Sequence, residues 1–328
     1  MSTKPKFARA LPMEDFPFSE AELAALHKTF PHGVIALDLE TTGLSPLTDR
    51  IIEIGAVKIV PHSSNSDSNK KVDKKSTLNN FQVEVFDELI DPRIPIPQIT
   101  TRIHGIDDTM IIDRPTIDEI LPEFLDFMDG LPIVAHNALF DIGFLVFNIH
   151  HLENLNSSFP NNEVFCSCRL SRSVFKEFNG HGLAKVTESL NIQLDNHHRA
   201  YDDALACLKV FGQALIKQSH EQHYLSSKLF HLGDFEAQKD FDIPEHIVGL
   251  RDFIPEQIPV MIKYKGGSYG KDFRPIRAIS MLPMPSGSIL YAHCLLSDLY
   301  KSFALKKIKG YREMTKKELE EFKEKLNT

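Results

Sequence analysis

Acidic side chains lie among apolar residues at three places in this chain, and the first is a pair. Asp38 and Glu40 stand two residues apart in a β-branched and aliphatic stretch, residues 34–40. Because side chains of a strand alternate between its faces, both carboxylates are expected on the same side of a sheet. Two desolvated carboxylates repel each other unless a cation neutralises them. A solvent-facing pair at a strand end would have the same spacing, so the pair alone does not identify a site.

The second place is Asp141, which follows an apolar segment at 131–135. On a helix that starts near Ala138, the Asp141 carboxylate shares a face with Phe144 and Leu145. This puts a charge on an apolar stripe. Alternatively, an acidic residue in the first helical turn could have no role other than a favourable interaction with the helix dipole.

The third place contains His198 and Asp203, five residues apart. On one helix they would point about 140° apart, so His198 is expected on the loop before the helix. Asp203 lies on the apolar face with Ala206, which favours it as the functional acid. Asp202 points outward and could be a cap or a dipole partner. His197 is a competing candidate for the role of His198.

These placements become coherent if four carboxylates converge on divalent cations. The four are Asp38, Glu40, Asp141 and Asp203. Oxygen ligands without paired thiols favour Mg²⁺ or Mn²⁺ over zinc. Two ions about 3.5–4 Å apart would stabilise the attacking and leaving oxygens of a displacement at phosphorus. Histidine is a common general base in enzymes, so His198 could take a proton from the attacking water.

Three motifs resemble those of the DEDDh exonucleases. They are Asp38-Leu39-Glu40-Thr41-Thr42-Gly43-Leu44, His136-Asn137 through Phe140-Asp141, and His198-x4-Asp203, with Ile103-His104-Gly105-Ile106 and His181-Gly182-Leu183 between them. This RNase H-like family contains the epsilon proofreading subunit of bacterial DNA polymerase III, RNase T and oligoribonuclease. The resemblance covers residues 33–217 and is closest to the epsilon-like branch.

The resemblance implies a role for each matching residue. Asp38, Glu40, Asp141 and Asp203 would bind two Mg²⁺ or Mn²⁺ ions, and His198 would be the general base. The terminal nucleotide would be held by Thr41, Thr42 and Leu44, with His104, Asn137 and Phe140 nearby; these six could also be ordinary turn and packing residues. The implied activity is hydrolysis from 3′ ends that releases nucleoside 5′-monophosphates.

The order of the strands and helices expected around these residues predicts an α/β fold. With the family resemblance, we expect an RNase H-like mixed sheet flanked by helices. Strands are expected at 34–40, 51–60, 81–90 and 131–135, and helices at 117–128, 138–150, 183–190 and 202–217. Residues 1–32 form a helical leader, in which Ser19 to Glu22 has the layout of a capping box. A polar insertion at 61–76 departs from the compact family pattern.

Beyond the exonuclease domain at 33–217, the sequence predicts a linker at 218–257 and a small β-rich domain with a terminal helix at 258–328. Four segments of this domain resemble a WYL-type β-barrel, although the chain has no Trp and Lys301 stands where arginine is usual. The segments are Pro259 to Tyr264, Phe273 to Arg277, Leu290 to Cys294 and Lys301 to Ile308. Basic residues beside aromatic ones in this region suit phosphate contact and base stacking, or form a solvated surface. They are Lys263, Lys265, Lys271, Arg274, Arg277, Lys306, Lys307 and Lys309, beside Tyr264, Tyr269 and Phe273.

Net charge, cysteine spacing and hydrophobicity indicate which kinds of binding, metal site and cellular location are expected. The net charge of −8 argues against bulk electrostatic binding of nucleic acid, but the charge is uneven. Residues 256–328 carry 14 Lys and Arg against 8 Asp and Glu, whereas residues 1–255 carry 23 against 37. The four cysteines show no C-x-x-C spacing, which excludes the common zinc and disulfide frameworks. Without a long apolar run or a signal-like start, a cytoplasmic protein with no membrane contact is expected.

Three hypotheses about function follow from these features. The first is an exonuclease on DNA ends in repair or proofreading, which could join a DNA polymerase or repair complex. The second keeps the chemistry but makes RNA the substrate, since no motif here discriminates the 2′-hydroxyl. The third is a nuclease-derived regulator that binds nucleic acid or a ligand without turnover, which the complete set of five site residues disfavours.

Overall fold

The computed structural model describes residues 7–13, 16–62, 80–152, 158–193, 198–218, 227–237, 243–266 and 272–323. The chain forms two compact units. One comprises Met1–Thr42, Ile51–Asp141 and Leu152–Asp234, and the other comprises Gly43–Arg50, Ile142–His151 and Phe235–Thr328. Most of the polar insertion at 61–76 lies outside the described residues, as do His197, Tyr269 and Lys271.

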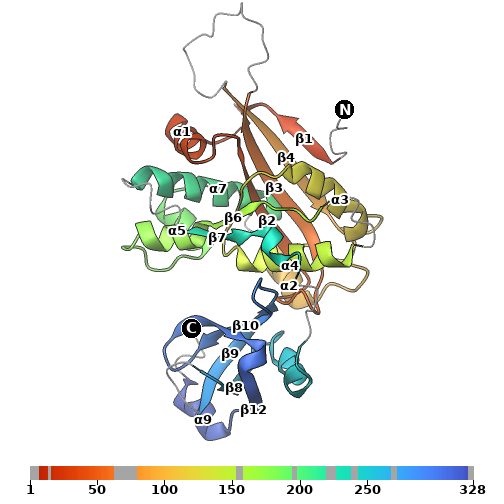
Figure 1. Ribbon diagram of the computed structural model, residues 1–328, viewed down its shortest axis with the longest axis vertical. Helices are drawn as coiled ribbons and strands as arrows, with labels where there is room; N and C mark the ends of the chain where they lie inside the picture. Colours follow the sequence, from red (N-terminus) through yellow and green to blue (C-terminus); the bar gives the residue numbers. More distant parts are fainter. Residues whose placement is uncertain are drawn as a thin grey trace, which may run out of the picture. The chain divides into compact units, whose positions relative to one another are not determined.

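The first unit is built on a seven-stranded mixed sheet with the strand order β1-β4-β3-β2-β5-β6-β7 (Figure 1). The strands are β1 (Ala8–Leu11), β2 (Val34–Thr41), β3 (Ile51–Pro61), β4 (Phe81–Leu89), β5 (Ile133–Ala135), β6 (Glu163–Cys166) and β7 (Lys228–His231). Strands β1 to β4 pair antiparallel, β5 and β6 continue parallel to β2, and β7 ends the sheet antiparallel to β6. The expected α/β fold, with a mixed sheet flanked by helices, is confirmed.

Three strands of this sheet were not expected from the sequence. Strand β1 lies in the leader, β6 precedes a helix directly, and β7 lies within the segment expected to be a linker. Each has four residues, too few to display the alternation that reveals a strand. The leader and the linker segment therefore contribute the two edges of the sheet.

Seven helices are described in the first part of the chain. They are α1 (Glu20–Thr29), α2 (Gln98–His104), α3 (Ile117–Met128), α4 (Leu139–His151), α5 (Ser167–Val174), α6 (Leu183–Ser189) and α7 (Ala200–Lys217). Helix α1 begins at the predicted capping box: the Ser19 hydroxyl accepts a hydrogen bond from the Glu22 backbone, and the Glu22 carboxylate accepts one from the Ser19 backbone. This pairing satisfies N–H groups that a helix start otherwise leaves open.

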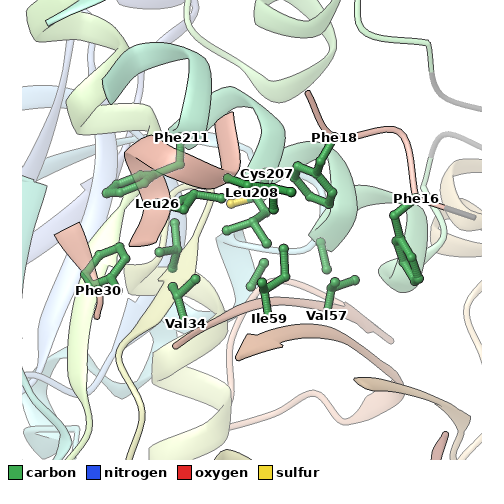
Figure 2. Packing of buried hydrophobic residues seen from close by; sticks show 14 of the residues in the cluster. Phe16, Phe18, Leu26, Phe30, Val34, Val57, Ile59, Cys207, Leu208 and Phe211 are labelled. Atoms are coloured by element: carbon green, nitrogen blue, oxygen red, sulfur yellow. The ribbon is translucent and has the colours of Figure 1, made fainter. Parts of the chain in front are cut away.

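One face of the sheet is covered by α1 and α7. Figure 2 shows Leu208 and Phe211 of α7 packing with Leu26 and Phe30 over alternate residues of the strands. Those strand residues are Val34 and Ala36 of β2, and Val57 and Ile59 of β3. Side chains two residues further along the same face must also point toward α7.

Helix α3 covers the opposite face. Phe86 of β4 contacts Phe124 and Phe127 of this helix with ring centroids 5.1 and 5.5 Å apart. Lys58 Nζ donates to the Phe127 carbonyl and forms an ion pair with Glu84 at 2.6 Å. The sheet is therefore buried on both sides, which explains the nearly continuous apolar sequence of β3.

The second unit contains a five-stranded antiparallel sheet with the order β11-β10-β9-β8-β12. Its elements are η3 (Leu232–Phe235) at the boundary between the units, η4 (Glu245–Phe253), β8 (Pro259–Tyr264), β9 (Phe273–Leu282), β10 (Ile289–Cys294), β11 (Leu299–Ala304), η5 (Leu305–Lys307), β12 (Ile308–Glu313) and α9 (Lys316–Glu321). One face of this sheet and η4 enclose an apolar core that includes Val260, Ile276, Leu290 and Phe303. The resemblance to a WYL domain stays a prediction.

The segments that join the second unit from earlier in the chain pack on its sheet. Leu44 and Leu47 lie against the apolar core, and the Ser45 hydroxyl donates to the Met281 carbonyl at 3.2 Å. A Cβ at Gly143 of α4 would lie 2.9 Å from the Leu282 side chain. Within the described part of the chain, none of the helices has the length and apolar character needed to traverse a bilayer.

Candidate active site

Asp38 and Glu40 lie on the face of β2 that α7 covers. They continue the alternation of Val34 and Ala36, both of which are buried beneath that helix. In the register of β2 with β3, Asp38 is opposite Gly55 and Glu40 is opposite Glu53. Three carboxyl groups from two neighbouring strands therefore point into the same space.

The start of α7 lies directly on β3 at Gly55. A Cβ at Gly55 would lie 2.1 Å from backbone atoms of Ala200 and Tyr201, so only glycine permits this approach. Glu53, one alternation further, accepts a hydrogen bond from the Ala200 backbone N–H at 2.9 Å. The negative charge of a buried carboxylate at the start of a helix also interacts favourably with the helix dipole. The contact holds the first turn of α7, and thus Asp203, above the two strands.

His198 lies on the loop before α7, as expected, because the helix begins at Ala200 with Arg199 as its N-cap. His198 has a φ of +63°, in the left-handed region, and Arg199 returns to an extended conformation. One side-chain ligand atom from each of Glu40, His198 and Asp203 lies within 4.8 Å of the other two. The imidazole is thus brought to the carboxylates by a sharp turn of the backbone.

Asp141 reaches the same strand from the first turn of α4. Its side chain is buried, with 2% exposure, and its Oδ1 accepts a hydrogen bond from the Leu39 backbone N–H at 3.2 Å. Leu39 separates Asp38 from Glu40 in β2. This bond fixes the Asp141 carboxylate beside the pair, although 102 residues separate it from Leu39 in sequence.

The carboxyl groups perturb one another strongly. Burial, and then the charges of Asp141, Glu40 and Asp203, raise the pKa of Asp38 well above its ordinary value. Burial, followed by the charges of Asp203 and Glu53, raises the pKa of Glu40 to about 8. Burial likewise raises the pKa of Asp141 to about 8, even though backbone N–H groups stabilise its charged form. By themselves, these groups cannot all be ionised at neutral pH at low cost.

A divalent cation fits this arrangement. The donors are carboxylate oxygens, the ligands that Mg²⁺ and Mn²⁺ prefer, with one imidazole beside them. A bound cation would stabilise the charged form of each carboxylate and offset the desolvation that raises its pKa. The positions of Asp38, Glu40, Asp141 and Asp203 are therefore compatible with the predicted metal site.

Asp202 and Asp203 lie in different surroundings. Asp203 is buried on α7, and its charge raises the pKa values of Asp38 and Glu40. The charge of Asp202 instead raises the pKa values of Tyr201 and Arg199. The structure therefore brings Asp203, rather than Asp202, to the pair on β2. His197, the alternative to His198, lies outside the described residues.

Among the residues predicted to hold a nucleotide, Thr41, Thr42 and His104 are buried in the first unit. His104 ends α2, and its Nδ1 accepts a hydrogen bond from the Ile106 backbone at 3.0 Å. Burial lowers the pKa of His104, with further effects from the charges of Glu53, His198 and Arg199. These charges place His104 near the loop that carries His198, and the lowered pKa favours its neutral form.

The other three predicted nucleotide contacts have different surroundings. Asn137 is exposed with a left-handed φ of +61°, and its carbonyl accepts a hydrogen bond from the Phe140 backbone at 3.0 Å. Phe140 is half-buried. Leu44 belongs to the second unit, where it packs against the apolar core. The roles of all three in substrate binding stay predictions.

Sequence reasoning missed one pair, Glu53 and Arg199. The guanidinium donates to both carboxylate oxygens of Glu53, with Nε distances of 3.0 and 3.2 Å. Glu53 is 1% exposed and flanked by isoleucines, so a charge inside a buried strand was the available signal. Its partner could not be identified, because Arg199 lies 146 residues away.

Comparison with known proteins supports the family suggested by these residues. A family model described as exonuclease, of the RNase T type, matches residues 35–211, more than half of the 328 residues. The chain is 37% identical over 183 residues to the DNA polymerase III PolC-type of Caldanaerobacter subterraneus subsp. tengcongensis, and 34% identical over 194 residues to that of Clostridium perfringens. These matches cover 56% and 59% of this chain but only 12% of each polymerase.

A solved structure, Exonuclease X in complex with 5′ overhanging duplex DNA, matches 59% of this chain and 99% of its own, at 22% identity and a TM-score of 0.40. At this identity and TM-score the likeness is distant. The family model, by contrast, spans all five residues of the candidate site, from Asp38 to Asp203. The chain therefore belongs to the RNase T-type exonuclease family.

Proposed function

We propose that this protein is a metal-dependent 3′→5′ exonuclease that releases nucleoside 5′-monophosphates from DNA ends in the cytoplasm. The observation that supports the proposal most directly is the cluster of carboxylates at β2, α4 and α7. Burial and mutual repulsion raise the pKa values of Asp38, Glu40 and Asp141 together. Such a cluster is costly for stability, which is typical of a site maintained for chemistry.

In this proposal, different residues bind the metal ions, accept a proton and orient the substrate. Asp38, Glu40, Asp141 and Asp203 would hold two Mg²⁺ or Mn²⁺ ions, which supply charge stabilisation at phosphorus when bound. His198 is exposed at the edge of the cluster and would accept the proton of the attacking water. Thr41, Thr42 and His104 would orient the terminal nucleotide, with Leu44, Asn137 and Phe140 as further predicted contacts.

The choice of DNA follows the relatives. The two relatives named above are DNA polymerases, and this chain corresponds to 12% of their length. We therefore propose a role in proofreading or repair, with a DNA polymerase or repair complex as the partner. We also propose that residues 33–217 carry the activity and that residues 258–328 assist in holding the nucleic acid.

A degradation assay tests the proposal. The full-length protein is incubated with 5′-labelled single-stranded DNA and Mn²⁺, with and without excess EDTA, and the products are separated by length. We expect a ladder of products that shorten from the 3′ end, which EDTA and Asp38→Ala abolish. Asp126→Asn, at an exposed position of α3, is the matched control and should leave the ladder unchanged.

Two results would contradict the proposal. Degradation that continues unchanged in EDTA would exclude the metal-dependent mechanism. Faster degradation of an RNA oligonucleotide of equal length would replace DNA by RNA as the substrate.

A further inference from the structure

The sheet of the second unit has an aromatic face that the proposed exonuclease reaction does not use. Along β10, Leu290 and Ala292 lie in the apolar core, so Tyr291 and His293 point to the opposite face. The register places His293 between Arg277 of β9 and Tyr300 of β11. Side chains from three strands thus meet on one surface.

Three rings on this face lie next to one another. The Tyr291 and Tyr300 rings are stacked, with centroids 5.8 Å apart and an interplanar angle of 19°. The His293 ring lies 5.1 Å from the Tyr300 ring at 37°. We call Tyr291, Tyr300 and His293 the ring row. His293 Nε2 lies 2.9 Å from Asp298 Oδ1, which fixes the imidazole within the row.

Tyr300 is the exposed member of the ring row, whereas Tyr291 is half-buried and His293 is buried. Tyr300 is 52% exposed, although it is a large aromatic residue, and the next residue toward the start of β11, Leu299, is 58% exposed. Strand β11 is an edge strand, and the pairing of β10 with β9 shifts register next to Tyr291. Such irregularities twist a strand and re-aim its side chains. The Tyr300 ring, with the half-buried Tyr291 ring beside it, is therefore accessible to a ligand.

The charge around the row suits an anionic ligand. Arg277 of β9 is the register partner of His293 and lies on the same face of the sheet. Across residues 256–328, Lys and Arg outnumber Asp and Glu by 14 to 8, opposite to the rest of the chain. Aromatic faces beside basic side chains on a sheet are the features that bind unpaired nucleobases.

We propose that the ring row binds single-stranded DNA by stacking bases on Tyr291 and Tyr300, with Arg277 facing the phosphates. The choice of DNA rests on the proposed function, whereas the stacking rests on the geometry of the sheet. Stacking tolerates any base because every base has a π-face. The site would hold the strand independently of its sequence.

Packing alone would not require this arrangement. Cross-strand aromatic pairs stabilise sheets, but this stabilisation does not require that one ring remain about half exposed, as Tyr300 is. The more central core residues of the same strands, Leu290 and Phe303, are 0% and 4% exposed, in contrast to Tyr300. The difference between a structural and a binding role can therefore be measured at Tyr300.

Fluorescence anisotropy with a 5′-labelled twelve-nucleotide single strand tests the proposal, in the full-length Asp38→Ala protein so that the probe stays intact. Tyr300→Leu keeps apolar volume but removes the ring, and we expect affinity to fall about tenfold. Tyr300→Phe keeps the ring and should bind like the parent. Leu299→Ala, at an exposed position of the same strand outside the ring row, is the control and should also bind like the parent.

Thermal melting of each variant separates binding from folding. An affinity loss in Tyr300→Leu with an unchanged melting temperature supports the ring row. Equal affinity in Tyr300→Leu and Tyr300→Phe overturns it, as does equal loss in Leu299→Ala. RNA of equal length that binds more tightly with the same dependence on Tyr300 would overturn DNA as the ligand. A change of oligomeric state, without a change of DNA affinity, would reassign the face to protein contact.

The outcome is independent of the nuclease proposal. If the parent protein degrades no DNA but Tyr300→Leu still weakens binding, only the proposal of exonuclease activity is contradicted. If Tyr300→Leu binds as the parent does while the nuclease remains active, only the ring row fails. Turnover of a dinucleotide, which is too short to occupy a second site, should be the same in the parent and in Tyr300→Leu.

Discussion

At the scale of single residues, Asp38 shows how the candidate site conflicts with stability. Its carboxyl group is partly buried, and Asp141, Glu40 and Asp203 all raise its pKa. An acid whose pKa is higher in the folded state destabilises that state once the pH exceeds its unfolded value, because the folded protein must then release a proton at a cost. Without a cation, the ionised Asp38 side chain therefore lowers the stability of the folded protein.

Asp38→Asn should therefore separate activity from stability. The amide is neutral at every pH, so we expect the metal-free melting temperature at pH 8 to rise by at least about 2 °C, since about 1 kcal/mol corresponds to a few degrees in a chain of this size. The same change should lower the exonuclease rate at least about a hundredfold, because a charged group of the site is lost. Calorimetry in EDTA and the degradation assay check the two effects.

A lower melting temperature in Asp38→Asn would show that the carboxylate stabilises the fold, contrary to this argument. Asp126→Asn is again the control, because Asp126 is exposed on α3. It should change neither the melting temperature nor the rate.

Glu53 acts through other groups rather than on the substrate. It holds Arg199 and the Ala200 backbone, the two residues after His198. In Glu53→Gln the ion pair is lost and the guanidinium stays partly buried, so we expect unfolding to become easier by about 2 kcal/mol. The loop that carries His198 should also lose its position, and kcat should fall more than KM changes.

Glu84→Gln is the matched control for that prediction. It breaks the ion pair with Lys58, which lies on β3 like Glu53 but faces α3. We expect it to reduce the free energy of unfolding while kcat stays as in the parent. Equal losses of kcat in Glu53→Gln and Glu84→Gln would mean that Glu53 contributes only to stability.

At the scale of elements, the approach of α7 to β3 decides whether the acidic residues meet. Gly55 lies under the first turn of α7, and a Cβ there would overlap backbone atoms that cannot move independently. Gly55→Ala must therefore displace the helix start, at a cost of about 3 kcal/mol. We expect lower stability in urea denaturation and a large loss of nuclease activity.

Gly182→Ala provides the comparison. Gly182 is the N-cap of α6 with φ −66°, and a Cβ there would contact no atom within 4 Å. This substitution should leave stability and activity close to those of the parent. If Gly55→Ala were equally well tolerated, the contact between α7 and β3 would not be what positions Asp203.

At the scale of the whole molecule, metal binding and proton binding should compete. The pKa values of Glu40 and Asp141 are about 8 without a cation, so these groups are largely protonated at pH 6 and about half ionised at pH 8. Their raised pKa values lower the stability of the metal-free protein as the pH rises from about 4 to about 8.

We therefore expect Mn²⁺ to raise the melting temperature more at pH 8 than at pH 6. At pH 6 the ion must displace protons from the carboxyl groups, whereas at pH 8 fewer are bound. At a concentration 100 times its dissociation constant, the ion would stabilise the protein by about 2.7 kcal/mol. Calorimetry at the two pH values, with EDTA as the blank, measures the difference. An equal rise in melting temperature at both pH values would contradict the competition between metal binding and proton binding.

Much of the first unit could be predicted from local patterns. The alternation at Asp38 and Glu40, and the helical face of Asp203, were visible because strands and helices repeat every two and 3.6 residues. The position of His198 before α7 followed from the same geometry, and the capping box at Ser19 was confirmed. The family expected from the three motifs is confirmed by the family model over residues 35–211.

Only the tertiary structure decided which distant segments meet. Strands β1 and β7 became edges of the sheet, Glu53 met Arg199, and residues 43–50 and 142–151 joined the second unit. The ring row likewise needs the register of β9, β10 and β11. Local periodicity states which face a side chain occupies, but it contains no information about the neighbour across that face. That neighbour is chosen by strand register and close packing over the whole fold.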